Sequence, residues 1–127
     1  MRKLPALTRE EVGHLDAALR AVADRTGRPV SFNALLKRWQ ELVHEVTVGY
    51  SLTLYDYTND LSVRDQIKEV LTRVPDSLRG RLEEVVRPLD ERFEEATTEL
   101  EKPLLPRSHR WWFRIPRKRS AELDADI

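Results

Sequence analysis

The sequence predicts an all-α fold: a bundle of about four helices, with a long central helix and an extended C-terminal tail docked on the bundle. Through residues 1–102, apolar side chains recur at three- and four-residue steps, the spacing that lines one face of a helix. Ser, Thr or Asp precedes these stretches and Gly or Pro follows them, as at helix ends. The helical period stops at Pro103 and Pro106. We therefore predict a helical bundle domain, residues 1–102, and a basic, aromatic tail with an acidic end, residues 103–127.

Length and composition indicate a single soluble domain. A chain of 127 residues that is 40% hydrophobic and 35% charged can bury one core. The sequence contains no cysteine, which excludes disulfides and thiolate metal sites and fits a reducing compartment. No apolar run in the sequence is long enough to span a bilayer. We therefore expect a cytoplasmic protein.

Start and stop signals define the first helix, from about Arg9 to Thr26. Thr8 and Glu11 have the spacing of a capping box, and Gly27 stands where a left-handed residue commonly ends a helix. The expected buried side consists of Val12, Leu15, Leu19 and Val22. Because only a few residues separate this helix from the next, we expect the two to be antiparallel neighbours.

The central stretch, from Ser31 to Asp60, contains no proline. Its apolar residues keep the helical phase throughout, which predicts one long helix capped by Ser31. Residues 46–54 also alternate between apolar and polar side chains, which is the period of a strand. We favour the helix because no other segment offers a strand to pair with, and a lone strand leaves its backbone groups unsatisfied. The choice between helix and strand for residues 46–58 stays open.

A helix that continues through the central stretch is apolar on two sides in its second half. On a helical wheel, Val48, Leu52 and Tyr55 fall opposite the stripe that contains Trp39 and Tyr50. Such a helix lies either inside a bundle or between two subunits. We therefore predict a non-enzymatic interaction or assembly protein, a homodimer or larger, with Val48, Leu52 and Tyr55 at or near the contact.

Two further helices are expected before the tail. Ser62 and Asp65 have capping-box spacing and open a shorter helix that Pro75 stops. The next helix runs to about Leu100, with a kink but no break at Pro88, because its apolar phase continues past that residue. Its outer face is strongly acidic and carries Glu83, Glu91, Glu94, Glu95 and Glu99.

The tail concentrates basic and aromatic side chains. Residues 102–119 contain seven basic residues and no acidic one, and the last eight residues contain three acidic ones. The residues expected to dock the tail or to bind an anion are Arg110, Trp111, Trp112, Phe113, Arg114, Arg117, Lys118 and Arg119. Exposed tryptophans are unfavourable, so we expect the tail to fold back on its own bundle with its arginines over the acidic face. The alternatives are an anionic membrane surface, a partner protein and, disfavoured by the acidic body of the chain, nucleic acid.

Two Glu-x-x-His pairs, a spacing found in ferritin-like carboxylate bundles, raise a remote metal hypothesis. They are Glu11 with His14 and Glu41 with His44. Glu11 is already needed for the capping box, and Glu41 and His44 point away from the stripe that contains Trp39. We therefore expect no metal or cofactor. The sequence also has no nucleophile motif and no phosphate-binding loop, and it indicates no small-molecule substrate, so we favour a protein without enzymatic activity.

Overall fold

The computed structural model of the chain describes residue 4 and residues 6–127. This part of the chain contains four long helices: α1 (Arg9–Thr26), α2 (Phe32–Val48), α3 (Leu54–Arg73) and α4 (Asp76–Glu95). They are followed by two short strands, β1 (Thr97–Glu99) and β2 (Arg114–Pro116), a 3-10 helix η1 (Arg110–Phe113) and a final helix α5 (Ala121–Ala125). The predicted all-α bundle with a docked tail is confirmed.

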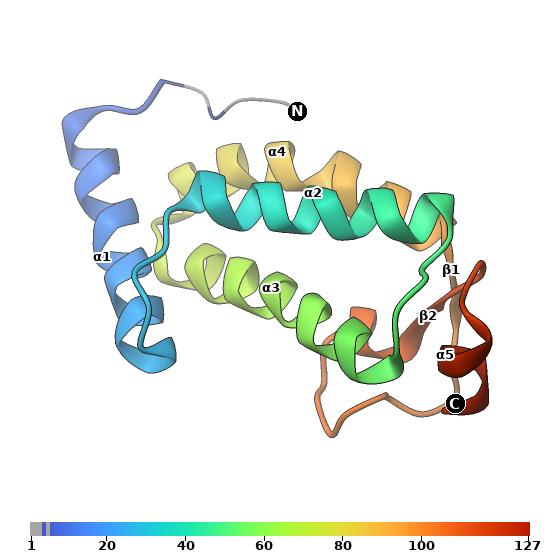
Figure 1. Cartoon of the computed structure of the whole chain (residues 1–127). Coiled ribbons are helices and arrows are strands. Elements are labelled where there is room, and N and C mark those ends of the chain that lie inside the picture. Colours follow the sequence, from blue (N-terminus) through green and yellow to red (C-terminus); the bar gives the residue numbers. More distant parts are fainter. Residues whose placement is uncertain (1–3, 5) are drawn as a thin grey trace.

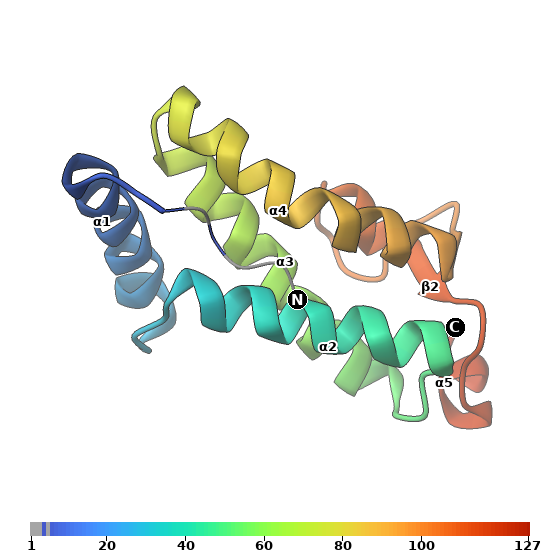
Figure 2. The same cartoon turned by 90° about the horizontal axis from the view of Figure 1, so that it is seen from above.

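Helices α2, α3 and α4 form the body of the bundle, α1 lies across one end of it, and the tail covers the other end (Figure 1, Figure 2). The predicted antiparallel pairing of α1 with α2 is wrong, because α1 packs mainly against α3 and runs steeply across the direction of α2 (Figure 1). A short turn keeps two helices close at one end but does not fix the angle between them.

The ends of α1 are those predicted. The Thr8 hydroxyl accepts a hydrogen bond from the Glu11 N–H at 3.1 Å, and the Glu11 carboxylate accepts one from the Thr8 N–H at 2.9 Å. Gly27 ends the helix at φ 77°, in the left-handed region. Val12, however, is 43% exposed, so it does not belong to the buried stripe. The buried residues of α1 are Leu15, Ala18, Leu19 and Val22.

The long central helix is the main error of the sequence analysis. Helix α2 ends at Val48, residues 49–53 are not helical, and α3 begins at Leu54. Gly49 takes φ 140°, which breaks the helix, and Tyr50 forms an isolated parallel bridge with Arg119 of the tail. No other segment was predicted to pair with a strand here, but the tail supplies a partner about 70 residues later. Residues 46–48 and 54–58 are thus helical, and the connection between them is neither a helix nor a regular strand.

The start of α3 also differs from the prediction. Thr53 caps it, and its hydroxyl accepts from the Asp56 N–H at 3.2 Å. Ser62 and Asp65 lie inside this helix and form no capping box; the Ser62 hydroxyl donates to the Asn59 carbonyl at 2.6 Å. Capping-box spacing occurs by chance within helices. Helix α3 begins instead at Leu54, directly after the non-helical connection of residues 49–53.

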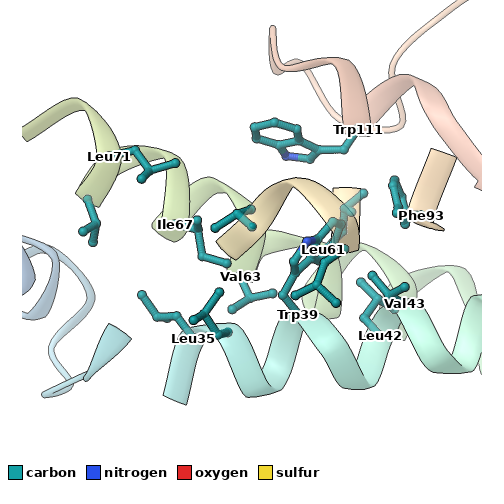
Figure 3. Close-up of a cluster of buried hydrophobic side chains, with 14 of the residues drawn as sticks. Leu35, Trp39, Leu42, Val43, Leu61, Val63, Ile67, Leu71, Phe93 and Trp111 are labelled. Atoms are coloured by element: carbon teal, nitrogen blue, oxygen red, sulfur yellow. The ribbon is translucent and has the colours of Figure 1, made fainter. Parts of the chain in front are cut away.

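The hydrophobic core lies between α2, α3 and α4, and the tail closes it (Figure 3). Trp39 is 1% exposed, as its place in the predicted stripe requires, and its ring centroid lies 4.9 Å from that of Phe93 on α4. Figure 3 shows Leu61 of α3 beside Trp39, Ile67 further along the same helix in the same cluster, and Trp111 of the tail above them. The tail is therefore part of the core.

Helix α4 continues through Pro88, as predicted, but it stops at Glu95 and does not reach Leu100. Residues 97–99 instead form β1, which pairs antiparallel with β2 in the register Thr97 with Pro116 and Glu99 with Arg114. None of the described helices combines the length and the apolar composition that crossing a membrane requires.

Candidate functional site

Three large apolar side chains are left in water where α2 ends and α3 begins. The exposed fractions are 65% for Val48, 46% for Leu52 and 79% for Tyr55. These are the residues predicted at a subunit contact, although they come from α2, from the connection and from α3 rather than from one continuous helix. We call them the apolar end patch. Figure 1 shows α5 beside the connection that carries the patch.

The backbone under the apolar end patch is held by the tail. The Tyr50 N–H donates to the Lys118 carbonyl at 2.8 Å, and the Ser120 N–H donates to the Tyr50 carbonyl at 2.8 Å. The Ser120 hydroxyl donates to the Leu52 carbonyl at 2.9 Å. The patch is thus presented on a connection whose backbone is paired.

Two buried tyrosines lie behind the patch. The Tyr50 hydroxyl donates to Asp60 at 2.7 Å, and the Tyr57 hydroxyl donates to the Arg114 carbonyl at 2.9 Å. The two rings meet edge to face, with their centroids 5.3 Å apart. Burial raises the pKa of both hydroxyls, and the carboxylate of Asp60 raises that of Tyr50 further. These polar groups stabilise the fold at the point where the chain turns.

The two adjacent tryptophans of the tail share one acceptor. The indole N–H of Trp111 donates to Oδ1 of Asp65 at 2.9 Å, and that of Trp112 donates to Oδ2 of the same carboxylate at 2.9 Å. Arg107 donates to Asp65 at 3.3 Å, and its guanidinium carbon lies 5.1 Å from the centroid of the Trp112 ring. Trp112 is completely buried. Asp65 therefore anchors the tail to α3.

A buried ion pair links α3 to α4. Arg64 donates from Nε and Nη2 to the two oxygens of Asp90 on α4, at 2.9 Å and 2.8 Å. Asp90 also accepts from the indole N–H of Trp39 at 3.0 Å. These residues were missed in the sequence analysis. Indole and guanidinium groups need acceptors when they are buried, but the sequence does not say which of its 22 acidic residues will serve.

The basic residues of the tail divide into two groups. Arg110 lies over the acidic face of α4 and pairs with Glu94 at 3.2 Å, and Arg114 donates to the Thr97 hydroxyl at 2.7 Å. Arg119 pairs with Asp124 of α5 at 2.7 Å. Arg117 and Lys118, in contrast, are exposed and line a groove beside α2 and α4.

Comparison with models of protein families, with curated proteins and with solved structures finds no match to this chain. What the chain can do is therefore inferred from its own surfaces.

The residues of the remote metal hypothesis are not brought together. Glu11 is held by the Thr8 N–H and by an ion pair with Arg81, and these contacts lower its pKa. In the part of the chain that the structure describes, no three His, Asp or Glu side chains form a group that could hold a metal ion. The four residues concerned are Glu11, His14, Glu41 and His44.

Proposed function

We propose that this protein is a non-enzymatic interaction protein that associates with a second copy of itself through the apolar end patch, and that it does so in the cytoplasm. The observation that carries the proposal is the exposure of Tyr55, 79% of whose surface is in water, while Tyr50 and Tyr57 nearby are buried. Aromatic side chains placed in this way are enriched at the centres of protein interfaces, because they bury a large area and still offer a polar group.

The position of the patch suits a contact between two copies. A two-fold axis uses the same surface of both partners, so each of the three side chains contributes twice to the buried area. A stable interface buries about 800 Å² on each partner, which is more than these three side chains supply. Helix α5 beside the patch, followed by the exposed Ile127, provides further surface at this end of the molecule.

The charge of the chain also permits association. It has 22 basic and 22 acidic residues, so its formal net charge at neutral pH is zero. Two copies therefore have no long-range repulsion to overcome, whereas a strongly charged chain would keep its copies apart.

The test is sedimentation equilibrium at micromolar concentrations of the chain and of two variants. In the first variant, Leu52→Glu and Tyr55→Glu place charges in the apolar end patch; we expect a dimer mass for the unchanged protein and a monomer mass for this variant. The matched control is Val12→Glu, which changes another partly exposed residue, on α1 at the opposite end of the bundle (Figure 1). The control should keep the dimer mass.

Circular dichroism should give the same helical content for all three proteins, because the changed side chains are not buried. A monomer mass for the unchanged protein would contradict the proposal. The same holds if the control loses the dimer as readily as the Leu52→Glu, Tyr55→Glu variant.

A further inference from the structure

A groove lies where the C-terminal ends of α2 and α4 meet the segment that follows β2. Its volume is about 250 Å³. Ala96 after α4 and the almost completely buried Val46 of α2 line it with apolar atoms, and three cationic side chains and one carboxylate contribute charge. The charged residues are Arg92, Glu95, Arg117 and Lys118. We call this cavity the basic groove.

The three cations of the basic groove have no side-chain partner in the part of the chain that the structure describes. Among the residues that the structure describes, the side chains of Arg92, Arg117 and Lys118 make neither an ion pair nor a hydrogen bond, and all three are exposed. This is unlike the rest of the tail, where Arg110 pairs with Glu94 and Arg119 pairs with Asp124. The intramolecular docking of the tail therefore does not account for Arg117 and Lys118.

The backbone positions of these cations are fixed. The Arg117 N–H donates to the Ala96 carbonyl at 3.1 Å, and the Lys118 carbonyl accepts from the Tyr50 N–H at 2.8 Å. Arg92 lies in the last turn of α4. Two segments that are distant in the sequence thus hold the three cations around one cavity, and a ligand does not have to order the backbone in order to bind.

Interaction with the helix ends explains only part of this arrangement. A cation near the C-terminus of a helix is favourable because of the helix dipole, and Arg92 has that position on α4. Arg117 and Lys118 belong to a different segment, and together the three cations exceed the single carboxylate, Glu95, by two positive charges. A phosphate monoester carries a charge of about −1.5 to −2 at neutral pH, which matches this excess.

We infer that the basic groove binds a phosphate group, with Arg92, Arg117 and Lys118 as the cationic ligands and the half-buried Ala96 next to the rest of the ligand. Guanidinium groups pair with phosphate oxygens in a bidentate manner, and a lysine adds a point charge. The phosphate belongs either to a small soluble molecule or to the headgroup of an anionic lipid. This inference does not depend on self-association, because the apolar end patch and the basic groove share no residue.

The experiment measures binding to two kinds of probe, soluble phosphates and lipid vesicles. Inorganic phosphate and glycerol 3-phosphate are titrated by calorimetry, and vesicles of phosphatidylcholine with or without phosphatidic acid are tested by cosedimentation. The groove variant is Arg117→Gln with Lys118→Gln. The matched control, Arg20→Gln with Arg28→Gln, removes the same charge from exposed positions on α1 and on the turn after it.

We expect saturable binding that weakens at least tenfold in the groove variant and is unchanged in the control. Binding of the soluble phosphates identifies a small molecule as the source, and binding of phosphatidic acid vesicles alone identifies a lipid headgroup. The variant Glu95→Gln should bind more tightly than the unchanged protein, because it removes the carboxylate from the groove.

Two results would overturn the inference. One is that neither the soluble phosphates nor the vesicles bind saturably. A lower melting temperature of the groove variant would not rescue the inference, because it would show only that the cations stabilise the helix ends. The other is that the control loses as much binding as the groove variant, because binding would then reflect overall charge. Sedimentation equilibrium on the groove variant distinguishes a failure of this inference from a failure of the proposed self-association. The groove variant should keep its dimer mass even though it loses phosphate binding.

Discussion

The guanidinium carbon of Arg64 lies 4.4 Å from the centroid of the Trp111 ring, so the tail stacks on a cation that is buried in the bundle. Arg64 is 6% exposed, and within the described part of the chain its Nη1 has no hydrogen-bond partner. The aromatic face supplies an electrostatic contact to a side chain that is almost completely buried. Trp111 therefore does more than cover apolar surface, since it also closes an ion pair that joins α3 to α4.

Replacing Asp65 should weaken the attachment of the tail. The variant Asp65→Ala leaves two indole N–H groups without their acceptor, and each unsatisfied buried donor costs about 1 to 3 kcal/mol. We expect a loss of about 2 to 5 kcal/mol in the free energy of unfolding by urea denaturation. Hydrogen exchange should show faster exchange for residues 110–115 than in the unchanged protein. Asp16→Ala, at an exposed position on α1, is the control, and an equally small effect of both changes would show that Asp65 is not the anchor.

Truncating Trp39 tests the centre of the core. Trp39→Ala removes an almost completely buried ring that contacts Phe93 and donates to Asp90, and such changes cost about 3 to 5 kcal/mol. Since small domains are stable by only about 5 to 15 kcal/mol, the variant should be severely destabilised or unfolded. Val12→Ala, a partly exposed site, should change the stability by roughly 0.5 kcal/mol. A denaturation midpoint that hardly moves for Trp39→Ala would contradict the described core.

Replacing Gly49 by alanine tests whether the chain breaks between α2 and α3. At φ 140° an alanine is strained, although its Cβ would have ordinary contact with Lys118 at 3.7 Å. We expect Gly49→Ala to destabilise the protein by about 1 to 3 kcal/mol in urea denaturation. Gly13→Ala is the matched control, because it lies in α1 with no atom near the added Cβ, and it should stabilise the protein by roughly 0.5 to 1 kcal/mol. If both substitutions stabilise, the chain continues as a helix through Gly49.

The buried tyrosines predict a loss of stability at alkaline pH. Burial raises the pKa of Tyr50 and Tyr57 above the usual value of 10.0, so the folded protein keeps these protons at a pH at which the unfolded chain has released them. Their effect on stability is therefore constant below a pH of about 10, and above it stability falls by up to about 1.4 kcal/mol per pH unit for each group. Tyr57→Phe should make this fall less steep in denaturation at pH 9 to 11.5.

The control for this experiment is Tyr55→Phe, which removes an exposed hydroxyl. It should leave the alkaline fall unchanged. An unchanged fall in Tyr57→Phe as well would mean that the phenol of Tyr57 ionises freely in the folded protein.

The parts of the fold that could be predicted are those that depend on residues close together in the sequence. The ends of α1 were predicted because Thr8, Glu11 and Gly27 act within a few residues of one another. Helix α4 was predicted to pass Pro88 because the apolar phase on both sides shows which face is buried. The end of α4 was placed too late, since Thr97 pairs with Pro116, and nothing near Thr97 indicates that partner.

The candidate sites show the same difference between features set by nearby residues and features set by partners distant in the sequence. The sequence marked Val48, Leu52 and Tyr55 as apolar residues away from the buried stripe, and they are exposed, but the reason given, one continuous helix, was wrong. It marked the basic residues of the tail as a group without separating Arg117 and Lys118 from those that pair internally. That separation depends on where Glu94 and Asp124 lie in the fold.

The pairing of Tyr50 with Lys118 and Ser120 also bears on the order in which the protein folds during its synthesis. These backbone hydrogen bonds join segments about 70 residues apart, so the connection between α2 and α3 cannot be completed before residues 118–120 have been synthesised. Until then Tyr50 lacks its backbone partners, and the local sequence fixes neither a helix nor a strand for residues 46–54. We therefore expect the turn between α2 and α3 to become fixed late in folding, after the helices on either side of it have formed.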